Sequence, residues 1–506
     1  MAGADVTTHD AASAAVPPSQ VEVPKYAWPA LWALVLGFFM ILVDSTIVSV
    51  ATPALMRAFN TGIDTVVWVT SAYLLAFAVP MLITGRLGDR IGPKRVYMIG
   101  LVVFTLSSAW CGLTGTLGLG IGWLIVARVV QGLGGSMMSP QTMTVIARIF
   151  PPQKRGGAMA LWGSTAGVAA LVGPIVGGLL IDSAGWEWIF LINVPIGILT
   201  VILVARLVPK LSTHTHTFDW VGVVLSAVGL FCVVFAIQEG ETYNWGRITG
   251  IISVPALIVL GVILLVAFVW WQWRQKSEPL VPLSLFSDRN FSVSSVAITA
   301  VGFSITAMIF PFMIYAQVVR GLDPTHAALL MAPQALASIV FAPIAGRLVD
   351  RVHPRILSGI GLLGMAATIF WLSRVMTPTS ATWQILLPAL FLGIFSSFVW
   401  GTLATGANRN LPPKSAGSGS GVYNTVRQVG SVIGSAAIAV LMESRITAHL
   451  PGAQGPSLSF GTNAVLPQFV KNGLSAALSD AMVLPAAVLL VGFLATLFFE
   501  NLRHLR

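Results

Sequence analysis

Apolar runs of about 20 residues recur along almost the whole chain, separated by polar connections that are mostly short. A run of this length crosses the hydrocarbon core of a bilayer, roughly 30 Å thick, as one helix. The pattern predicts fourteen spans, at 28–53, 65–84, 96–116, 121–145, 157–181, 189–208, 220–238, 250–272, 291–316, 325–345, 356–375, 383–405, 417–441 and 480–499. The longest predicted connection is 442–479. An even number of spans places both chain ends on one side of the membrane.

The distribution of Lys and Arg predicts which side that is. Of the 28 basic residues, six fall in connections on the side opposite the N-terminus and two fall inside spans, which leaves 20 on the N-terminal side. Because basic residues concentrate in cytoplasmic loops, we expect both termini to be cytoplasmic. Residues 1–27 lack the basic start and short apolar run of a cleavable signal. They and residues 500–506 are therefore predicted to be cytoplasmic tails.

Composition excludes several other classes of protein. The chain is 56% hydrophobic and 9% charged, whereas soluble globular proteins are about 25% charged and disordered chains are poor in hydrophobic residues. The net charge of +10 would suggest nucleic-acid binding in a soluble protein. Here the basic cytoplasmic loops account for it, so we expect no nucleic-acid partner. Cys111 and Cys232 both lie in apolar stretches, which argues against a disulfide framework.

One segment of the chain is repeated at an offset of 261 residues. Gly85 to Lys94 reads GRLGDRIGPK and Gly346 to Arg355 reads GRLVDRVHPR, with six of ten positions identical. Internal repeats of this kind mark transporters built from two similar halves, with the substrate site between them. Residues 28–208 and 291–499 are then two six-helix bundles, and residues 209–290 insert two further spans. The predicted fold class is an all-α integral membrane protein.

Several motifs resemble those of one transporter family. Gly85 to Arg95 resembles the cytoplasmic motif between spans two and three of the major facilitator superfamily, and Leu124 to Gly135 resembles its basic motif in span four. Asp44 to Val48 resembles the span-one motif of its fourteen-span members, and Trp186 to Gly197 matches a familiar stretch of the same branch. From Leu31 to Phe499, the chain resembles the fourteen-span drug/proton antiporter branch of this superfamily.

The resemblance implies a proton-coupling role for two charges predicted inside spans. Asp44 in span one and Arg128 in span four have similar predicted depths. A charge near the bilayer centre costs about 2.5–3.5 kcal/mol on insertion scales, so it usually faces a cavity or a partner. One interpretation is that Asp44 takes up and releases the coupling proton beside Arg128. The alternative is a permanent structural salt bridge.

The resemblance also implies a cytoplasmic gate. Its candidates are charged residues in the repeated loops and in span thirteen: Asp89, Arg90, Arg95, Asp350 and Arg427. The alternatives are that the loop charges only fix the topology, and that Arg427 binds lipid phosphate or substrate.

Span five carries candidates for the family's antiporter motif: Gly167, Gly173, Pro174, Gly177 and Gly178. Small residues let a neighbouring helix approach closely, and packing alone could explain them. The resemblance adds a pivot, or a seal against proton leak, which is typical of exporters.

Candidates for contact with substrate are aromatic and polar residues on helices predicted to line a cavity: Tyr73, Gln131, Phe303, Phe310, Phe312, Phe395, Phe398 and Tyr423. An apolar pocket with few polar groups suits bulky amphipathic ligands. For each residue alone, core or lipid-facing packing is the alternative.

The predicted function is proton-coupled export of hydrophobic or amphipathic, often cationic compounds across a bacterial cytoplasmic membrane, by alternating access. The chain lacks the phosphate loop G-x-x-x-x-G-K-[ST] and metal-ligand spacings, so we expect no cofactor, no metal and no enzymatic activity. The expected partners are a small-molecule substrate, protons and the lipid bilayer, with the protein acting as a monomer. Involvement of a periplasmic adaptor stays open. The alternatives are export of an endogenous lipid, siderophore or secondary metabolite, or a non-transporting receptor or scaffold.

Overall fold

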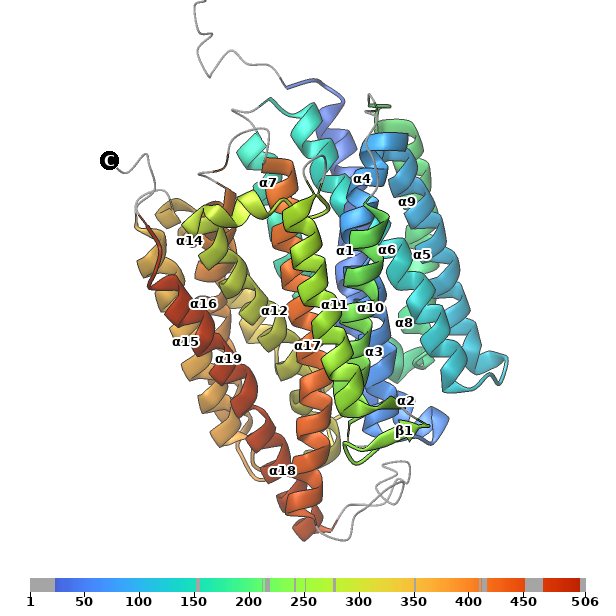
Figure 1. The fold of residues 1–506 in the computed structure, drawn as a ribbon. Helices are drawn as coiled ribbons and strands as arrows, with labels where there is room; N and C mark the ends of the chain where they lie inside the picture. Colours follow the sequence, from blue (N-terminus) through green and yellow to red (C-terminus); the bar gives the residue numbers. More distant parts are fainter. Residues whose placement is uncertain are drawn as a thin grey trace, which may run out of the picture.

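The computed structural model is a bundle of long helices with one small β-hairpin (Figure 1). It describes residues 23–151, 155–211, 213, 219–240, 243–250, 252–275, 279–349, 352–408, 411, 416–450 and 467–500. Among these residues, twelve helical segments are long and apolar enough to cross a membrane, and two shorter apolar helices run over Thr65–Ala78 and Val172–Ala184. The prediction of an all-α membrane fold is confirmed.

Most of the first group of helices lies on the right of Figure 1, and α7 lies nearer the second group. Its elements are α1 (Ala27–Val50), α2 (Thr52–Phe59), α3 (Ile63–Ala78), α4 (Met81–Ile91), α5 (Pro93–Thr116), α6 (Ile121–Ile149), α7 (Arg155–Ala184), α8 (Trp188–Leu191) and α9 (Asn193–Leu207). Within this group, α1 packs against α7 and α9, and α6 packs against α3 and α5. The contact between α5 and α6 is especially close, because a Cβ atom at Gly134 would lie 2.6 Å from the backbone nitrogen of Phe104.

The second group lies on the left of Figure 1. Its elements are the 3₁₀ helix η2 (Leu283–Ser287), α12 (Arg289–Ile314), the π-helical turn η3 (Tyr315–Val319), α13 (Pro324–Leu329), α14 (Ala332–Val349), α15 (Pro354–Val375), α16 (Thr382–Asn408), α17 (Ala416–His449), α18 (Gln468–Ala481) and α19 (Val483–Thr496). Here α12 packs against α17 and α19, and α16 packs against α14 and α15. The start of α1 and the end of α19 lie at the same end of the molecule (Figure 1).

The first copy of the repeated motif forms the end of one helix and a tight turn. Pro80 separates α3 from α4, since proline provides no backbone N–H for a continuous helix. Gly92 follows α4 with φ of 100°, a conformation that residues with a side chain rarely adopt, and α5 begins at the next residue. The glycine therefore allows the chain to reverse between α4 and α5 without a longer loop.

The inserted segment is a helical hairpin that packs on one side of the bundle. It consists of α10 (Trp220–Gln238), the antiparallel strands β1 (Arg247–Thr249) and β2 (Ile252–Ser253), and α11 (Val254–Arg274). Leu230 and Val234 of α10 share a hydrophobic cluster with Val432 and Ala436 of α17, whereas little of α11 is buried. The helix α10 therefore covers α17, and α11 presents its apolar side chains to the outside.

A carboxylate holds one end of this hairpin together. Asp219 precedes α10 and accepts a hydrogen bond from the backbone N–H of Gly222 at 2.9 Å. It also accepts from Trp271 Nε1 at 2.7 Å and from Gln272 Nε2 at 2.6 Å, both on α11. Since the Gln272 Oε1 atom accepts from the backbone N–H of Val281 at 3.0 Å, the same cluster anchors the connection to η2.

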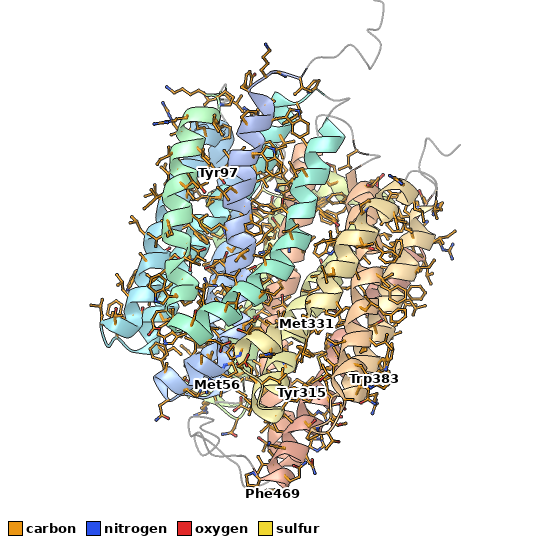
Figure 2. All side chains as sticks on the ribbon, turned by 180° about the vertical axis from the view of Figure 1, so that it is seen from behind. Met56, Tyr97, Tyr315, Met331, Trp383 and Phe469 are labelled. Atoms are coloured by element: carbon orange, nitrogen blue, oxygen red, sulfur yellow. The ribbon has the colours of Figure 1, made fainter. Side chains whose placement is uncertain are left out.

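The region between spans thirteen and fourteen is more helical than the sequence predicts. We expected a connection over 442–479, but α17 continues to His449 and α18 begins at Gln468. His449 Nε2 lies 2.9 Å from Asp480 Oδ2, which joins the two helices. Figure 2 shows Phe469 near the tip of this extension, at the end of the molecule opposite Tyr97. Apolar periodicity misses these turns because charged and polar residues such as Glu443, Arg445 and Lys471 interrupt the apolar runs.

Candidate functional site

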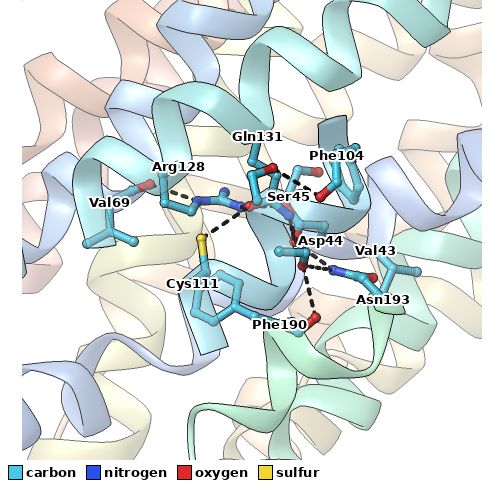
Figure 3. Close-up of polar contacts among 12 residues, drawn as sticks. Val43, Asp44, Ser45, Val69, Phe104, Cys111, Arg128, Gln131, Phe190 and Asn193 are labelled. Carbon is cyan, nitrogen blue, oxygen red and sulfur yellow. Dashed lines mark hydrogen bonds and ion pairs between the residues drawn. The ribbon is translucent and has the colours of Figure 1, made fainter. Parts of the chain in front are cut away.

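The side chain of Asp44 lies at the centre of a buried polar network within the first group of helices (Figure 3). It sits on α1 and has 0% of its surface exposed. Its Oδ2 atom accepts a hydrogen bond from Arg128 Nη1 at 2.5 Å. Its Oδ1 atom accepts from Gln131 Nε2 at 2.8 Å and from Asn193 Nδ2 at 2.9 Å. The carboxylate thus receives three donors from α6 and α9.

Arg128 on α6 is also completely buried and is held at several atoms. Its Nε atom donates to the backbone oxygen of Val69 at 3.1 Å, and its Nη1 atom also donates to Gln131 Oε1 at 2.6 Å. The guanidinium carbon lies 4.0 Å from the ring centroid of Tyr73, in cation–π geometry. Its Nη2 atom has no partner in the described part of the chain. The positive charge of Arg128 is therefore neutralised by Asp44, and its Nη2 atom can donate a further hydrogen bond.

A second layer of polar groups supports the amides. Ser108 Oγ on α5 accepts from Gln131 Nε2 at 3.1 Å and from Asn193 Nδ2 at 3.0 Å. It donates to the backbone oxygen of Phe190 at 2.9 Å. Because all of these groups are buried, each lost contact would leave a polar atom without water, which costs about 1–3 kcal/mol. The network therefore fixes the orientation of both amides.

The geometry suits a carboxylate that changes its partners when it binds a proton. The hydrogen bonds that Asp44 receives from Arg128, Gln131 and Asn193 all come from donors, and an ionised carboxylate has only acceptors. A protonated carboxyl needs an acceptor for its O–H. Gln131 Oε1 already accepts from Arg128 Nη1 and from Cys111 Sγ, which occupy both of its lone pairs. Proton uptake therefore requires at least one of these side chains to move.

Sequence reasoning identified Asp44, Arg128 and Gln131 but missed Asn193 and Ser108. Asn193 stands inside the stretch WEWIFLINVPIG, where an amide in an apolar run was a usable signal. Ser108 gave no signal, because serine is common in spans and forms local bonds there. Tyr73 and Gln131, predicted to contact substrate, both lie in the Asp44 network.

Five of the other substrate candidates lie in or against one hydrophobic cluster of the second group of helices: Phe303, Phe310, Phe312, Phe395 and Tyr423. Phe310 and Phe312 are buried in the core of the second group of helices. Phe395 is half-buried and stacks on Phe391 with 6.3 Å between ring centroids. Phe303 and Phe398 are half-buried. Tyr423 is buried, and its hydroxyl has no partner among the described residues.

The gate candidates are described only in part. Arg90 lies in the last turn of α4, Arg95 lies in the first turn of α5, and both are exposed. The helix α4 includes position 89, but the side chain of Asp89 lies outside the described part of the chain, as does all of Asp350. Arg427 on α17 is half-buried, and its guanidinium carbon lies 6.0 Å from the ring centroid of Trp400.

The predicted antiporter motif lies on α7, where its glycines contact two different partners. A Cβ atom at Gly173 would collide with the Thr46 side chain, and one at Gly177 would lie 2.5 Å from Ile47 Cγ1, so both glycines face α1. One at Gly178 would lie 2.5 Å from the Cα atom of Thr325 on α13. Pro174 is buried within α7, and for Gly167 only the helical backbone is described.

Comparison with known proteins identifies the family. A model of the Major Facilitator Superfamily matches residues 34–435. The chain is 50% identical over 478 residues to an MFS-type transporter of Mycobacterium tuberculosis. The matched region covers 94% of this chain and 81% of that protein. It is 32% identical over 449 residues to the tetracenomycin C resistance and export protein of Streptomyces glaucescens, covering 87% and 80%. It is 31% identical over 422 residues to the multidrug export protein EmrB of Haemophilus influenzae, covering 82% and 81%.

Solved structures show the same fold at low sequence identity. A bacterial homologue of the human lysosomal transporter Spinster, in an inward-facing and unoccupied conformation, matches with a TM-score of 0.63 and 17% identity, covering 94% of this chain and 98% of that chain. A D-xylose–proton symporter matches with a TM-score of 0.60 and 15% identity, covering 92% and 97%. The chain belongs to the major facilitator superfamily and, within it, to the multidrug-efflux transporters that its motifs resemble.

Proposed function

We propose that this transporter is a drug/proton antiporter in which Asp44 carries the coupling proton and Arg128 stabilises its ionised form. The observation that carries the proposal is the fully buried contact between these two side chains, with Gln131 and Asn193 on the second carboxylate oxygen. Charges inside a membrane are costly and usually functional. A residue that binds a proton in one state and an arginine in the other can link proton movement to a conformational change.

The proposal includes fourteen spans and cytoplasmic termini. The two shorter apolar segments, Thr65–Ala78 and Val172–Ala184, extend the twelve longer ones to fourteen. Each of these segments is part of a longer stretch of helix. The first lies in α3, which α4 follows almost directly, and the second is the end of α7, which begins at Arg155. The common position of the start of α1 and the end of α19 supports termini on one side (Figure 1), and the basic loops on that side support a cytoplasmic location.

The cargo we propose is a hydrophobic or amphipathic drug-like compound, moved from the cytoplasm to the outside by a monomer in a bacterial cytoplasmic membrane. The names of the Streptomyces and Haemophilus relatives refer to export of tetracenomycin C and of multiple drugs. The half-buried rings of Phe303, Phe395 and Phe398 are candidates for apolar contacts with such a compound. Residues Asp89, Asp350 and Arg427 are candidates for the cytoplasmic gate.

Transport into everted membrane vesicles tests this function. A panel of fluorescent dyes and drugs is followed with an imposed proton gradient, and again after a protonophore has removed it. We expect gradient-dependent accumulation of at least one compound, and its loss in the variant Asp44→Asn with the protein still present in the membrane. Unchanged gradient-driven accumulation by Asp44→Asn would refute the proton-coupling role. If the parent protein accumulates the compound equally well with and without the proton gradient, antiport would be refuted.

A further inference from the structure

The two groups of helices meet at the end of the molecule that the proposed topology places outside. Figure 2 shows Met56 of α2 and Tyr315 of η3 at this end, and Gln317 Nε2 of η3 donates to the backbone oxygen of Val50 at 2.9 Å. Here α7 and α13 approach each other closely. A Cβ atom at Gly178 would lie 2.5 Å from Thr325 Cα and 2.8 Å from the backbone oxygen of Pro324. No other residue type fits at position 178 while the helices remain this close.

One turn further along α7, a carboxylate reaches the same point on α13. Asp182 Oδ2 accepts a hydrogen bond from the backbone N–H of Thr325 at 3.1 Å and a second, short one from the Thr325 hydroxyl. Gly178 and Asp182 are four residues apart and therefore lie on one face of α7. The first provides the space for α13, and the second provides polar contacts to it.

The start of α13 thus receives two carboxylates, one from each group of helices. Asp323 accepts from the backbone N–H of His326 at 2.7 Å, which is an ordinary N-cap from the same segment. Asp182 satisfies the Thr325 N–H from the opposite group. Asp323 caps the N–H of His326, whereas the N–H of Thr325 is a second first-turn donor that Asp182 satisfies. Asp182 therefore caps α13 and joins the two groups of helices at the same time.

We propose that Asp182 is a positioning residue of the transport cycle. With Gly178 and Thr325 it forms an outer seal, which keeps the outer face closed and separates when substrate is released. This inference rests on the proposed function, because only alternating access requires the outer face to open. The chemistry allows repeated separation: Asp182 and Thr325 are accessible to solvent, so water replaces the broken bonds at low cost.

Labelling of one cysteine reports the state of the seal. Ile181 of α7 is half-buried and contacts hydrophobic clusters from both groups of helices, so Ile181→Cys becomes accessible when they separate. The background lacks Cys111 and Cys232, and a membrane-impermeant maleimide is applied to intact cells. We expect Asp182→Ala to raise the labelling rate about two- to fivefold, as suits exposed charge-assisted contacts, and Asp182→Asn, which keeps the acceptor oxygen, to raise it less.

The matched control is Asp323→Ala, which removes a carboxylate from the same helix end without removing a contact between the groups. Its labelling rate should stay near that of the parent. Equal rates in the Asp182 and Asp323 variants, or no change in the Asp182 variants, would overturn the proposal. Labelling uses cells without substrate and without a proton gradient, so the assay requires neither a known cargo nor a proton-carrying role for Asp44. In everted vesicles, Asp182→Ala should raise the KM for substrate more than it lowers kcat, because fewer molecules face inward.

Discussion

Removing the two buried charges together, rather than singly, separates the coupling role of Asp44 and Arg128 from a structural one. Both side chains have 0% exposure and contact each other at 2.5 Å. Asp44→Asn leaves the guanidinium buried without an anion, and Arg128→Gln leaves the carboxylate buried without a cation. Breaking a buried pair from one side costs about 3–5 kcal/mol. The double variant Asp44→Asn/Arg128→Gln contains neither charge and keeps amide groups that can form hydrogen bonds.

The expected outcome is that stability and transport respond differently. Each single variant should lower the free energy of unfolding by about 3–5 kcal/mol, and the double variant should regain most of that loss, because no uncompensated charge remains. Export driven by a proton gradient should be absent in all three, since none can exchange a proton at position 44 against a nearby cation. The assays are denaturant unfolding of the purified protein in detergent and dye accumulation in everted vesicles.

Two results would refute this reasoning. Gradient-driven export that returns in the double variant would show that the pair is only a structural salt bridge. Single variants as stable as the parent would show that the charges are solvated, and the argument from burial would then be wrong. The matched control is Gln272→Met on α11, a buried polar residue outside the Asp44 network, which should lose stability without losing coupling.

The other predictions concern the two supporting clusters. Asn193→Leu removes one of two donors on Asp44 Oδ1, a loss of about 1.5–3 kcal/mol, and should slow gradient-driven export by roughly tenfold or more. Thr200→Val on the same helix, which removes only a local bond to Ile196, should change vesicle transport little. Asp219→Asn weakens three contacts at the inserted hairpin and should lower the thermal unfolding midpoint, while transport per folded molecule stays unchanged.

The sequence predicted the charged part of the site because charges inside apolar runs are rare and costly. Asp44 and Arg128 stand out in any reading of the hydrophobic pattern, and the structure brings them together. The neutral members did not stand out in the same way. Ser108 matters only because α5 meets α6 and α9 at that depth, and periodicity along one helix contains no information about which helices meet. Gln131 was identified, but its partners depend on the same tertiary contacts.

Helix boundaries could be predicted where a helix ends together with its apolar run, and were less predictable elsewhere. The predicted span 65–84 ran across Pro80, but α3 ends at Ala78 and α4 begins at Met81. The pattern identified 417–441 as a span and missed the continuation of α17 to His449. Beyond the apolar run, that continuation is held by contacts such as those of Leu450 with Gly473 on α18. Such contacts have no local signature in the sequence.

The position of α7 suggests how the Asp44 network and the outer seal are connected. Gly173 and Gly177 contact Thr46 and Ile47, which lie two and three residues after Asp44 on α1, whereas Gly178 on the neighbouring face contacts α13. Because close packing without intervening side chains transmits small displacements, we expect a movement of α1 at Asp44 to displace the seal as well. Contact alone does not establish coupling, which requires an energetic test.

We therefore expect Asp44→Asn and Asp182→Ala to have non-additive effects on the labelling rate of Ile181→Cys. The fold-change in the double variant should differ from the product of the two single fold-changes by at least twofold. Asp323→Ala, combined with Asp44→Asn in the same way, should be additive within error, because it caps α13 from its own segment. If the effects of Asp44→Asn and Asp182→Ala on the labelling rate are strictly additive, the seal does not respond to Asp44 through α7. The helix α7 would then only pack between the two sites.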